Sequence, residues 1–74
     1  MADRTITLTA SLTPEEGGYV ARCLEIGVTT EGDTLDEALA MLREAVALYL
    51  EDEPLPEPIA HPVVTSFDIT LTAA

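Results

Sequence analysis

One amphipathic helix, ended by proline, constrains this chain more than any other feature of its sequence. Apolar side chains recur at helical spacing over about 24 Å of helix. Thr34 and Glu37, three residues apart, form the pattern of a capping box, in which each side chain binds the other residue's backbone N–H. The sequence therefore predicts a helix near residues 34–51, and Pro54 ends it because proline lacks a backbone N–H.

Alternation of apolar and polar residues predicts strands on both sides of the helix. The stretch TITLTASL alternates strictly, and the pair Gly17-Gly18 after Pro14 suits the tight turn of a hairpin. Residues 53–62 contain four of the five prolines, which indicates a stiff, extended connector. The predicted strands lie near residues 4–12, 18–24, 27–32 and 63–71.

The order of these elements, β-β-β-α-β, predicts a single α+β domain over residues 1–74, with one helix packed on one face of a small sheet. The opposite sheet face carries Thr and Ser and is expected to be wet. A core this small gains much from a partner subunit, so we expect a homodimer, with edge-to-edge and face-to-face contact both open. The expected core residues are Ile6, Leu8, Tyr19 or Val20, Leu39, Leu42, Val46 and Phe67.

The net charge is the most unusual feature of the composition. Fourteen acidic residues against three arginines and no lysine give a charge of −11 at pH 7. Such a chain repels phosphate backbones and anionic membranes, so we expect no direct nucleic-acid binding and no membrane association by this chain alone. Two interpretations stay open: the acids keep a small domain in solution, or they attract a basic protein partner.

Cysteine usage and the N-terminus favour the cytoplasm. Cys23 is the single cysteine, so no intramolecular disulfide can form, which indicates a reducing compartment. The N-terminus shows no signal-peptide pattern, and no apolar run approaches the roughly 18 residues of a membrane span.

Catalysis, metal binding and cofactor binding find little support in the sequence, and we expect no enzyme activity. There is no glycine-rich phosphate loop, metal-ligand spacing or nucleophile elbow. His61, the single histidine, is expected to be a partly exposed loop residue, because a general base needs an orienting partner and a cleft. Cys23 is expected to be a small core or sheet residue. Acids at the start of the helix could approach a divalent cation, but Asp36 and Glu37 already suit the helix dipole and the cap. This acidic group comprises Glu31, Asp33, Asp36 and Glu37.

Residues 15–52 resemble the core of the HicB-type antitoxins. That family shows an acidic turn followed by Gly-Gly-Tyr-Val, then Gly-Asp-Thr, then Glu-Glu-Ala, and a helix that ends in Leu-Tyr-Leu. Residues 23–28 depart from the pattern, because the family commonly has a proline-flanked break at this point. The matching segments are Gly17-Gly18-Tyr19-Val20, Gly32-Asp33-Thr34, Asp36-Glu37-Ala38, Glu44-Ala45 and Leu48-Tyr49-Leu50.

The resemblance implies a partial ribonuclease-H-like fold and a basic protein partner. HicB-type antitoxins neutralise HicA-type toxins, which are small basic ribonucleases that cleave mRNA, by covering the active face of the toxin. A positive RNA-binding face is attracted to an acidic surface, so the resemblance favours the partner interpretation of the charge. The expected contacts are Asp36, Glu37, Glu44 and Glu51 on the helix, with Glu15 and Glu16 in the hairpin turn.

The sequence differs from many family members at its C-terminus, and two other functions stay open. Many HicB-type antitoxins carry a C-terminal DNA-binding domain, whereas this sequence stops after its predicted fourth strand, so we expect no direct operator binding. The chain could instead be a stand-alone scaffold or regulatory subunit of the same fold, without a toxin and without enzymatic activity. A hydrolase that uses the carboxylates ranks last.

Overall fold

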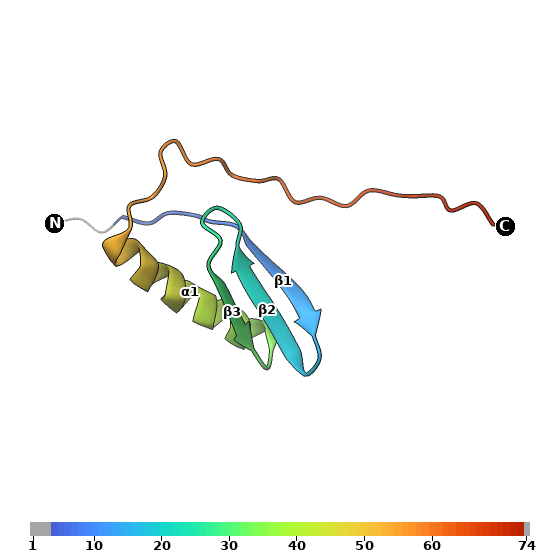
Figure 1. Ribbon diagram of the computed structural model, residues 1–74, viewed down its shortest axis with the longest axis horizontal. Coiled ribbons are helices and arrows are strands. Elements are labelled where there is room, and N and C mark those ends of the chain that lie inside the picture. Colours follow the sequence, from blue (N-terminus) through green and yellow to red (C-terminus); the bar gives the residue numbers. More distant parts are fainter. Residues whose placement is uncertain (1–3, 74) are drawn as a thin grey trace.

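The computed structural model describes residues 4–73 and shows three antiparallel strands followed by one helix (Figure 1). The strands lie side by side in the order β1-β2-β3, and the helix covers one face of the sheet. This arrangement confirms the predicted α+β class with a single helix packed on the sheet. The elements are β1 (Ala10–Glu15), β2 (Gly18–Cys23), β3 (Thr29–Gly32) and α1 (Leu35–Asp52).

Two glycine turns set the register of the sheet. Gly17 closes the β1–β2 hairpin with a φ of 82°, and Gly27 returns the chain toward β3 with a φ of 81°. Glycine adopts such angles without the steric cost that a Cβ brings. In the resulting register Leu12 lies opposite Ala21, and Ala21 lies opposite Thr30. Ala21 therefore sits at the centre of the sheet, with no exposed surface.

The helix begins at the predicted cap and lies tightly against β3. Thr34 Oγ1 accepts a hydrogen bond of 3.1 Å from the backbone N–H of Glu37. Gly32 allows the close approach, because a Cβ at this position would overlap the backbone of Ala38. The helix packs chiefly against β3 and β2 and less against β1. Within residues 4–73, no helix is both long and apolar enough to cross a membrane.

The core lies between α1 and the sheet, and it is small. Leu42 is the one large aliphatic side chain buried in the described part of the chain, and Cys23 is 2% exposed, as a core cysteine should be. Leu8, Tyr19 and Val46 are half-buried and pack around this centre. The buried core consists of Ala21, Cys23, Ala38 and Leu42. Three more of the expected core residues are half-buried, namely Ile6, Val20 and Leu39.

The first strand lies later in the chain than predicted. Residues 4–9 are not part of the sheet, and β1 begins at Ala10 and continues to Glu15. The reason is that β2 ends at Cys23 and the chain then turns away, so residues 4–9 have no strand beside them. The last backbone contact is the hydrogen bond of 2.9 Å from Leu24 N–H to Thr9 O.

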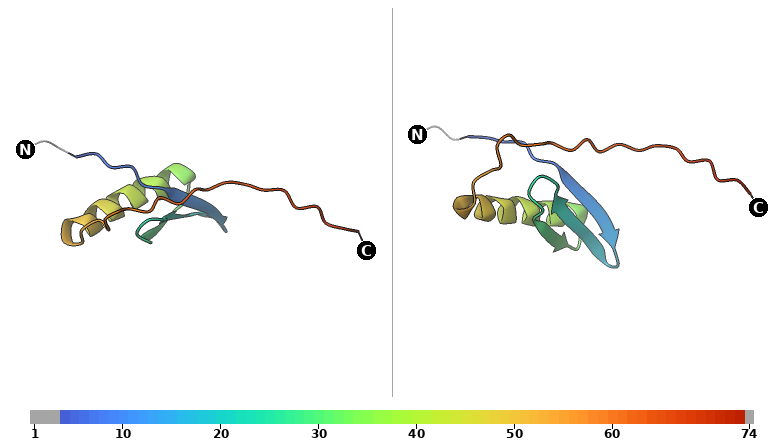
Figure 2. Two further views of the ribbon diagram at one scale, coloured as in Figure 1. Left: turned by 90° about the horizontal axis from the view of Figure 1, so that it is seen from above. Right: turned by 45° about the horizontal axis from the view of Figure 1, so that its top comes forward.

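The predicted fourth strand does not form in the single chain. Residues 63–73, here named the C-terminal arm, carry no secondary structure and run out past the sheet (Figures 1 and 2). Phe67, predicted to be a core residue, is 80% exposed. The arm makes the molecule long: the radius of gyration is 15.8 Å, against about 11 Å for a compact chain of this length. A strand forms only beside another strand, and the arm lies beside none.

Candidate functional site

An acidic hollow lies where the hairpin turn meets the start of the helix. It measures about 280 Å³, and three glycines are among its ten lining residues. Of the expected contact residues, Glu15, Glu16 and Glu37 border this hollow. Glu31 and Asp33 join them, although the sequence suggested only a cation-binding role for these two. The lining contains no basic residue, so the hollow gathers negative charge from three separate segments.

The remaining expected contacts lie along the helix. Glu37, Glu44 and Glu51 recur every seven residues, so they share one side of α1, while Asp36 points about 100° away from Glu37. All four are exposed. The acidic hollow and this row meet at Glu37, which makes one continuous acidic surface from the hairpin turn to the end of the helix.

Two apolar side chains interrupt the acidic row. Met41 is 47% exposed and Leu48 is 59% exposed. Each stands three or four residues from the neighbouring glutamates, which places it between them on the same side of the helix. No role was expected for these two residues, although their spacing from Glu44 and Glu51 places them on the same side of the helix. We call the set Glu37, Met41, Glu44, Leu48 and Glu51 the outer helix stripe.

The acids of this surface form no ion pair within the described part of the chain. The single ion pair among residues 4–73 joins Glu25 to His61, far from the stripe in the sequence. The acidic hollow and the outer helix stripe therefore present uncompensated negative charge to the solvent, with apolar side chains beside it. Such a surface can attract a basic molecule and hold it by apolar contact as well as by charge.

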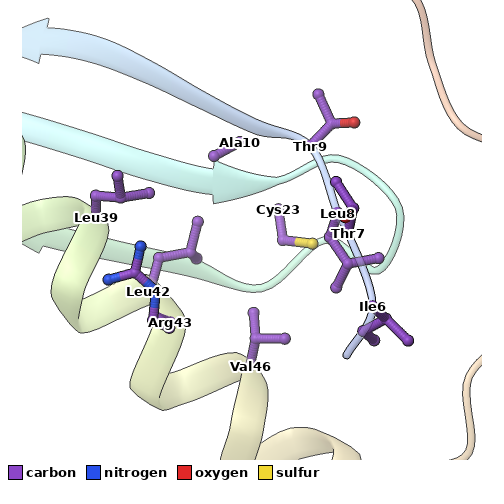
Figure 3. Close-up of a pocket in the computed structure, with 10 residues that line it drawn as sticks. All are labelled: Ile6, Thr7, Leu8, Thr9, Ala10, Cys23, Leu39, Leu42, Arg43 and Val46. Carbon is purple, nitrogen blue, oxygen red and sulfur yellow. The ribbon is translucent and has the colours of Figure 1, made fainter. Parts of the chain in front are cut away.

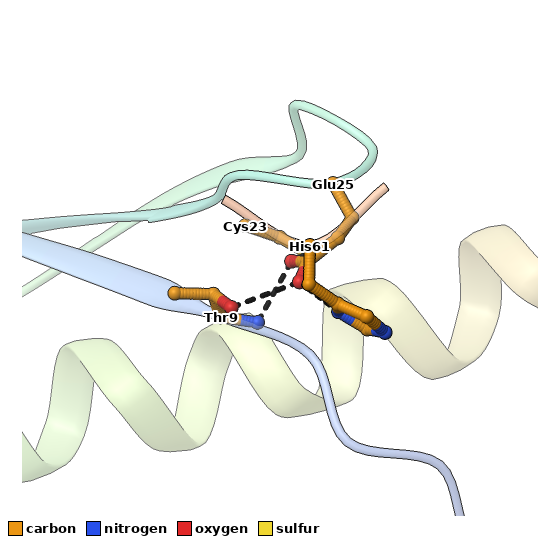
Figure 4. A network of polar contacts seen from close by, with 4 residues as sticks. All are labelled: Thr9, Cys23, Glu25 and His61. Atoms are coloured by element: carbon orange, nitrogen blue, oxygen red, sulfur yellow. Dashed lines mark hydrogen bonds and ion pairs between the residues drawn. The ribbon is translucent and has the colours of Figure 1, made fainter. Parts of the chain in front are cut away.

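Glu25 forms a second polar cluster, which ties three segments together (Figure 4). Its carboxylate accepts hydrogen bonds from the backbone N–H of Thr9 at 2.7 Å and from Thr9 Oγ1 at 2.8 Å. His61 Nδ1 lies 2.8 Å from Glu25 Oε2, and Cys23 Sγ donates weakly to Oε1 at 3.8 Å. The Glu25 side chain is 1% exposed, whereas that of His61 is 52% exposed.

The Glu25 carboxylate is ionised at neutral pH. Burial by itself raises the pKa of Glu25, but the hydrogen bonds from the Thr9 backbone, His61 and the Thr9 hydroxyl outweigh this effect and lower the pKa to about 2. His61 thus has an orienting partner that the sequence did not reveal. It lines neither the acidic hollow nor the apolar groove described below, and its contact with Glu25 joins the connector to the β2–β3 turn and, through Thr9, to the N-terminal segment.

An apolar groove of about 310 Å³ opens between the N-terminal segment and the helix (Figure 3). Residues 6–10 lie on one side of it and α1 on the other, and Cys23 also lines it. Arg43 lies at its rim, and the aliphatic lining consists of Ile6, Leu8, Ala10, Leu39, Leu42 and Val46. The groove is the uncovered flank of the core, on the side of the sheet where β1 forms the edge.

The acids at the start of the helix do not converge on a metal position. Within residues 4–73, no group of three or more His, Cys, Asp or Glu side chains is arranged to hold a metal ion. The backbone N–H of Glu37 donates to Thr34 in the cap, while Glu37 itself borders the acidic hollow. The arrangement thus supports a protein-binding surface better than a cation site.

Comparison with known proteins gives a family and one relative. Residues 4–73 match the profile described as "Family of unknown function (DUF7387)". The UPF0150 protein ssl0738 of Synechocystis sp. is 51% identical over 39 residues, which is 51% of this chain and 54% of that protein. The chain therefore spans about half the length of this curated relative. No solved structure matches.

Proposed function

We propose that this chain, which belongs to the DUF7387 family of unknown function, is a HicB-like antitoxin that binds and neutralises a small basic toxin of the HicA type. The observation that carries the proposal is the uncompensated acidic surface formed by the acidic hollow and the outer helix stripe. The order of motifs over residues 15–52, which resembles that of HicB-type antitoxins, supports it independently.

The physical basis is competition between this surface and RNA for the same basic face. A ribonuclease that binds an RNA backbone must present positive charge, and an acidic surface is attracted to that charge over several ångströms. Met41 and Leu48 add exposed apolar area at the centre of the stripe, where contact excludes water. Once docked, the antitoxin covers the active face and keeps RNA out. The chain acts in the cytoplasm in this proposal and binds no nucleic acid itself.

The first test uses the protein encoded beside this chain. A neighbouring reading frame for a small basic protein with a histidine should be expressed alone and together with this chain. We expect growth arrest and mRNA cleavage from the neighbour alone, and relief of both when the two are expressed together. A neighbour that this chain neither binds nor neutralises contradicts the proposal and leaves the scaffold interpretation.

The second test locates the binding surface. We expect the double variant E44K/E51K to keep its fold, because both side chains are exposed and unpaired in the structure. Its association with the toxin should be slower at low salt, and the deficit should shrink as salt rises. The matched control is E53K/E57K, which changes the net charge equally in the connector. Equal binding by both variants means that net charge, and not the outer helix stripe, determines recognition.

A further inference from the structure

The C-terminal arm has the side-chain pattern of a strand but lies beside no strand. Odd-numbered positions carry most of its large apolar side chains, and even-numbered positions from Ser66 to Thr70 are polar. Successive side chains of an extended chain point to opposite sides, so the arm has one apolar face and one mostly polar face. The exposed apolar residues are Val63 (89%), Val64 (67%), Phe67 (80%), Ile69 (67%) and Leu71 (86%). So much exposed apolar surface on one short segment indicates that something covers it.

The β1 edge of the sheet offers unpaired backbone groups to which the arm could hydrogen-bond. The strand order β1-β2-β3 leaves β1 unpaired along one side. β1 has six residues, and residues 6–9, which are not part of the sheet, lead into it from the N-terminal side. The apolar groove lies along the same edge, between residues 6–10 and the helix (Figure 3). A strand added beside β1 therefore has both backbone partners and an apolar surface for one of its faces.

The β3 edge is the poorer site. This strand has four residues, and two of them, Thr29 and Glu31, are exposed polar residues. It also leads directly into the acidic hollow, where Glu31 and Asp33 border the surface. An apolar arm finds no aliphatic lining there, whereas the groove beside β1 is lined by six aliphatic side chains.

The C-terminal arm begins two residues after His61, which Glu25 holds. His61 is held by Glu25 beside Thr9, one residue before the start of β1. Pro62 follows at once, and its ring fixes the backbone just before Val63. From that point the arm diverges from the body of the molecule (Figures 1 and 2). The longest extent of the molecule, 63 Å, is about twice the next, 31 Å, so the arm reaches well beyond its own sheet.

We propose that the C-terminal arm of one chain pairs with the β1 edge of a second copy and inserts its apolar face into that copy's apolar groove. The exchange is reciprocal, because each chain carries one arm and one groove, and it closes a symmetric homodimer. Phe67 and Ile69 lie at the middle of the arm and enter the groove, while Ser66 and Thr70 stay in solvent. Each chain then completes the sheet and the core of the other.

The assembly test compares the two faces of the same arm. The variant F67N/I69N places two amides on the apolar face, and the matched control S66N/T70N places two amides on the polar face. By light scattering, wild type and the control should have twice the 7.9 kDa mass of one chain. The dissociation constant of F67N/I69N should rise roughly 100-fold or more. Both variants should keep the helical circular dichroism signal of α1, because these side chains are exposed in the single chain. A dimer that withstands F67N/I69N overturns the proposal.

Crosslinking distinguishes exchange from the alternatives. Chains carrying F67C and chains carrying L39C, treated together with a short bismaleimide, should crosslink to each other, while V64C on the other face of the arm should react less with L39C. Native Cys23 is buried and does not compete. Efficient crosslinking of F67C with itself instead reveals arm-to-arm pairing and refutes the exchange. A wild-type monomer whose arm amides are protected from hydrogen exchange at every concentration shows that the arm folds onto its own chain, which also refutes it.

Discussion

Replacing Glu25 by glutamine tests how much of the fold depends on one carboxylate. Glu25 Oε1 and Oε2 accept the hydrogen bonds that hold Thr9 and His61, and the side chain is 1% exposed. Glutamine keeps the size and can still form some of these hydrogen bonds, but it removes the charge. The structure therefore predicts that E25Q loosens the contact between the N-terminal segment, the β2–β3 turn and the connector, without opening a cavity.

The magnitude follows from the pKa of Glu25. Its value is 4.5 for an unperturbed glutamate and about 2 in the folded chain, a difference that corresponds to about 3 kcal/mol of stability at neutral pH. Solvent lies close to every group in a molecule that is 18 Å across at its thinnest, and its screening reduces this value. We expect E25Q to lower the free energy of unfolding by about 1–2 kcal/mol, which shifts the melting temperature by roughly 10 °C in a domain of this size.

The pH dependence gives the decisive measurement. Because folding lowers the pKa, the carboxylate stabilises the fold fully above pH 4.5, and this contribution is lost as the pH falls toward about 2. Denaturant unfolding of wild type should therefore show a loss of stability over this interval that E25Q lacks. E31Q is the matched control, since Glu31 is exposed and lies outside the cluster. All chains are compared at one concentration, because dimerisation shifts the apparent stability. Identical pH profiles for wild type and E25Q would refute the reasoning.

Three further substitutions test the helix cap, the packing of the helix against β3 and the Glu25 cluster. T34A removes the side-chain cap of α1 and should cost about 1 kcal/mol by denaturant unfolding, with T13A at an exposed position of β1 as the control. G32A places a Cβ against the backbone of Ala38, which cannot move independently, and should cost about 1–3 kcal/mol; G17A should also destabilise, but through its φ of 82° and without a clash. H61A removes an exposed partner of Glu25, so its effect on unfolding should stay below about 1 kcal/mol, yet hydrogen exchange of the Thr9 amide should speed up.

Local signals in the sequence predict the helix and the hairpin, because both depend on neighbouring residues. The Thr34 cap and the glycine turn at Gly17 are present in the structure where the sequence places them. The alternation in residues 63–71 shows that this segment has one apolar face if the chain is extended. The alternation does not identify the surface that this face contacts, because strand pairing joins residues that are distant in the sequence or belong to another chain.

The Glu25 cluster could not be predicted from the sequence, because its residues are also distant in the chain. Glu25 lies 16 residues from Thr9 and 36 residues from His61, and no spacing or motif connects them. The acidic hollow was partly predictable: the sequence places Glu31 and Asp33 near Glu37 at the start of the helix. Their position beside Glu15 and Glu16 depends on the register of β2 with β3. Met41 and Leu48 follow the same helical spacing as the glutamates, so their place on the outer helix stripe could have been predicted from the sequence.

Charge and core size together explain why this chain should depend on partners, and they separate the two interactions proposed for it. Fourteen acids on a body with four buried core residues repel one another, and little apolar burial offsets that repulsion. A second copy supplies apolar area through the arm but doubles the negative charge, whereas a basic toxin supplies the opposite charge. Salt should therefore change the affinities of these two interactions in opposite directions. Raising the ionic strength from about 0.15 M to 1 M shortens the screening length from about 8 Å to 3 Å, which should weaken binding of a basic partner and strengthen arm exchange between two chains of charge −11. Light scattering and toxin titration across that range should show opposite slopes. Parallel slopes would mean that the dimer contact and the toxin contact share one surface, and the arm and the outer helix stripe would then no longer be independent sites.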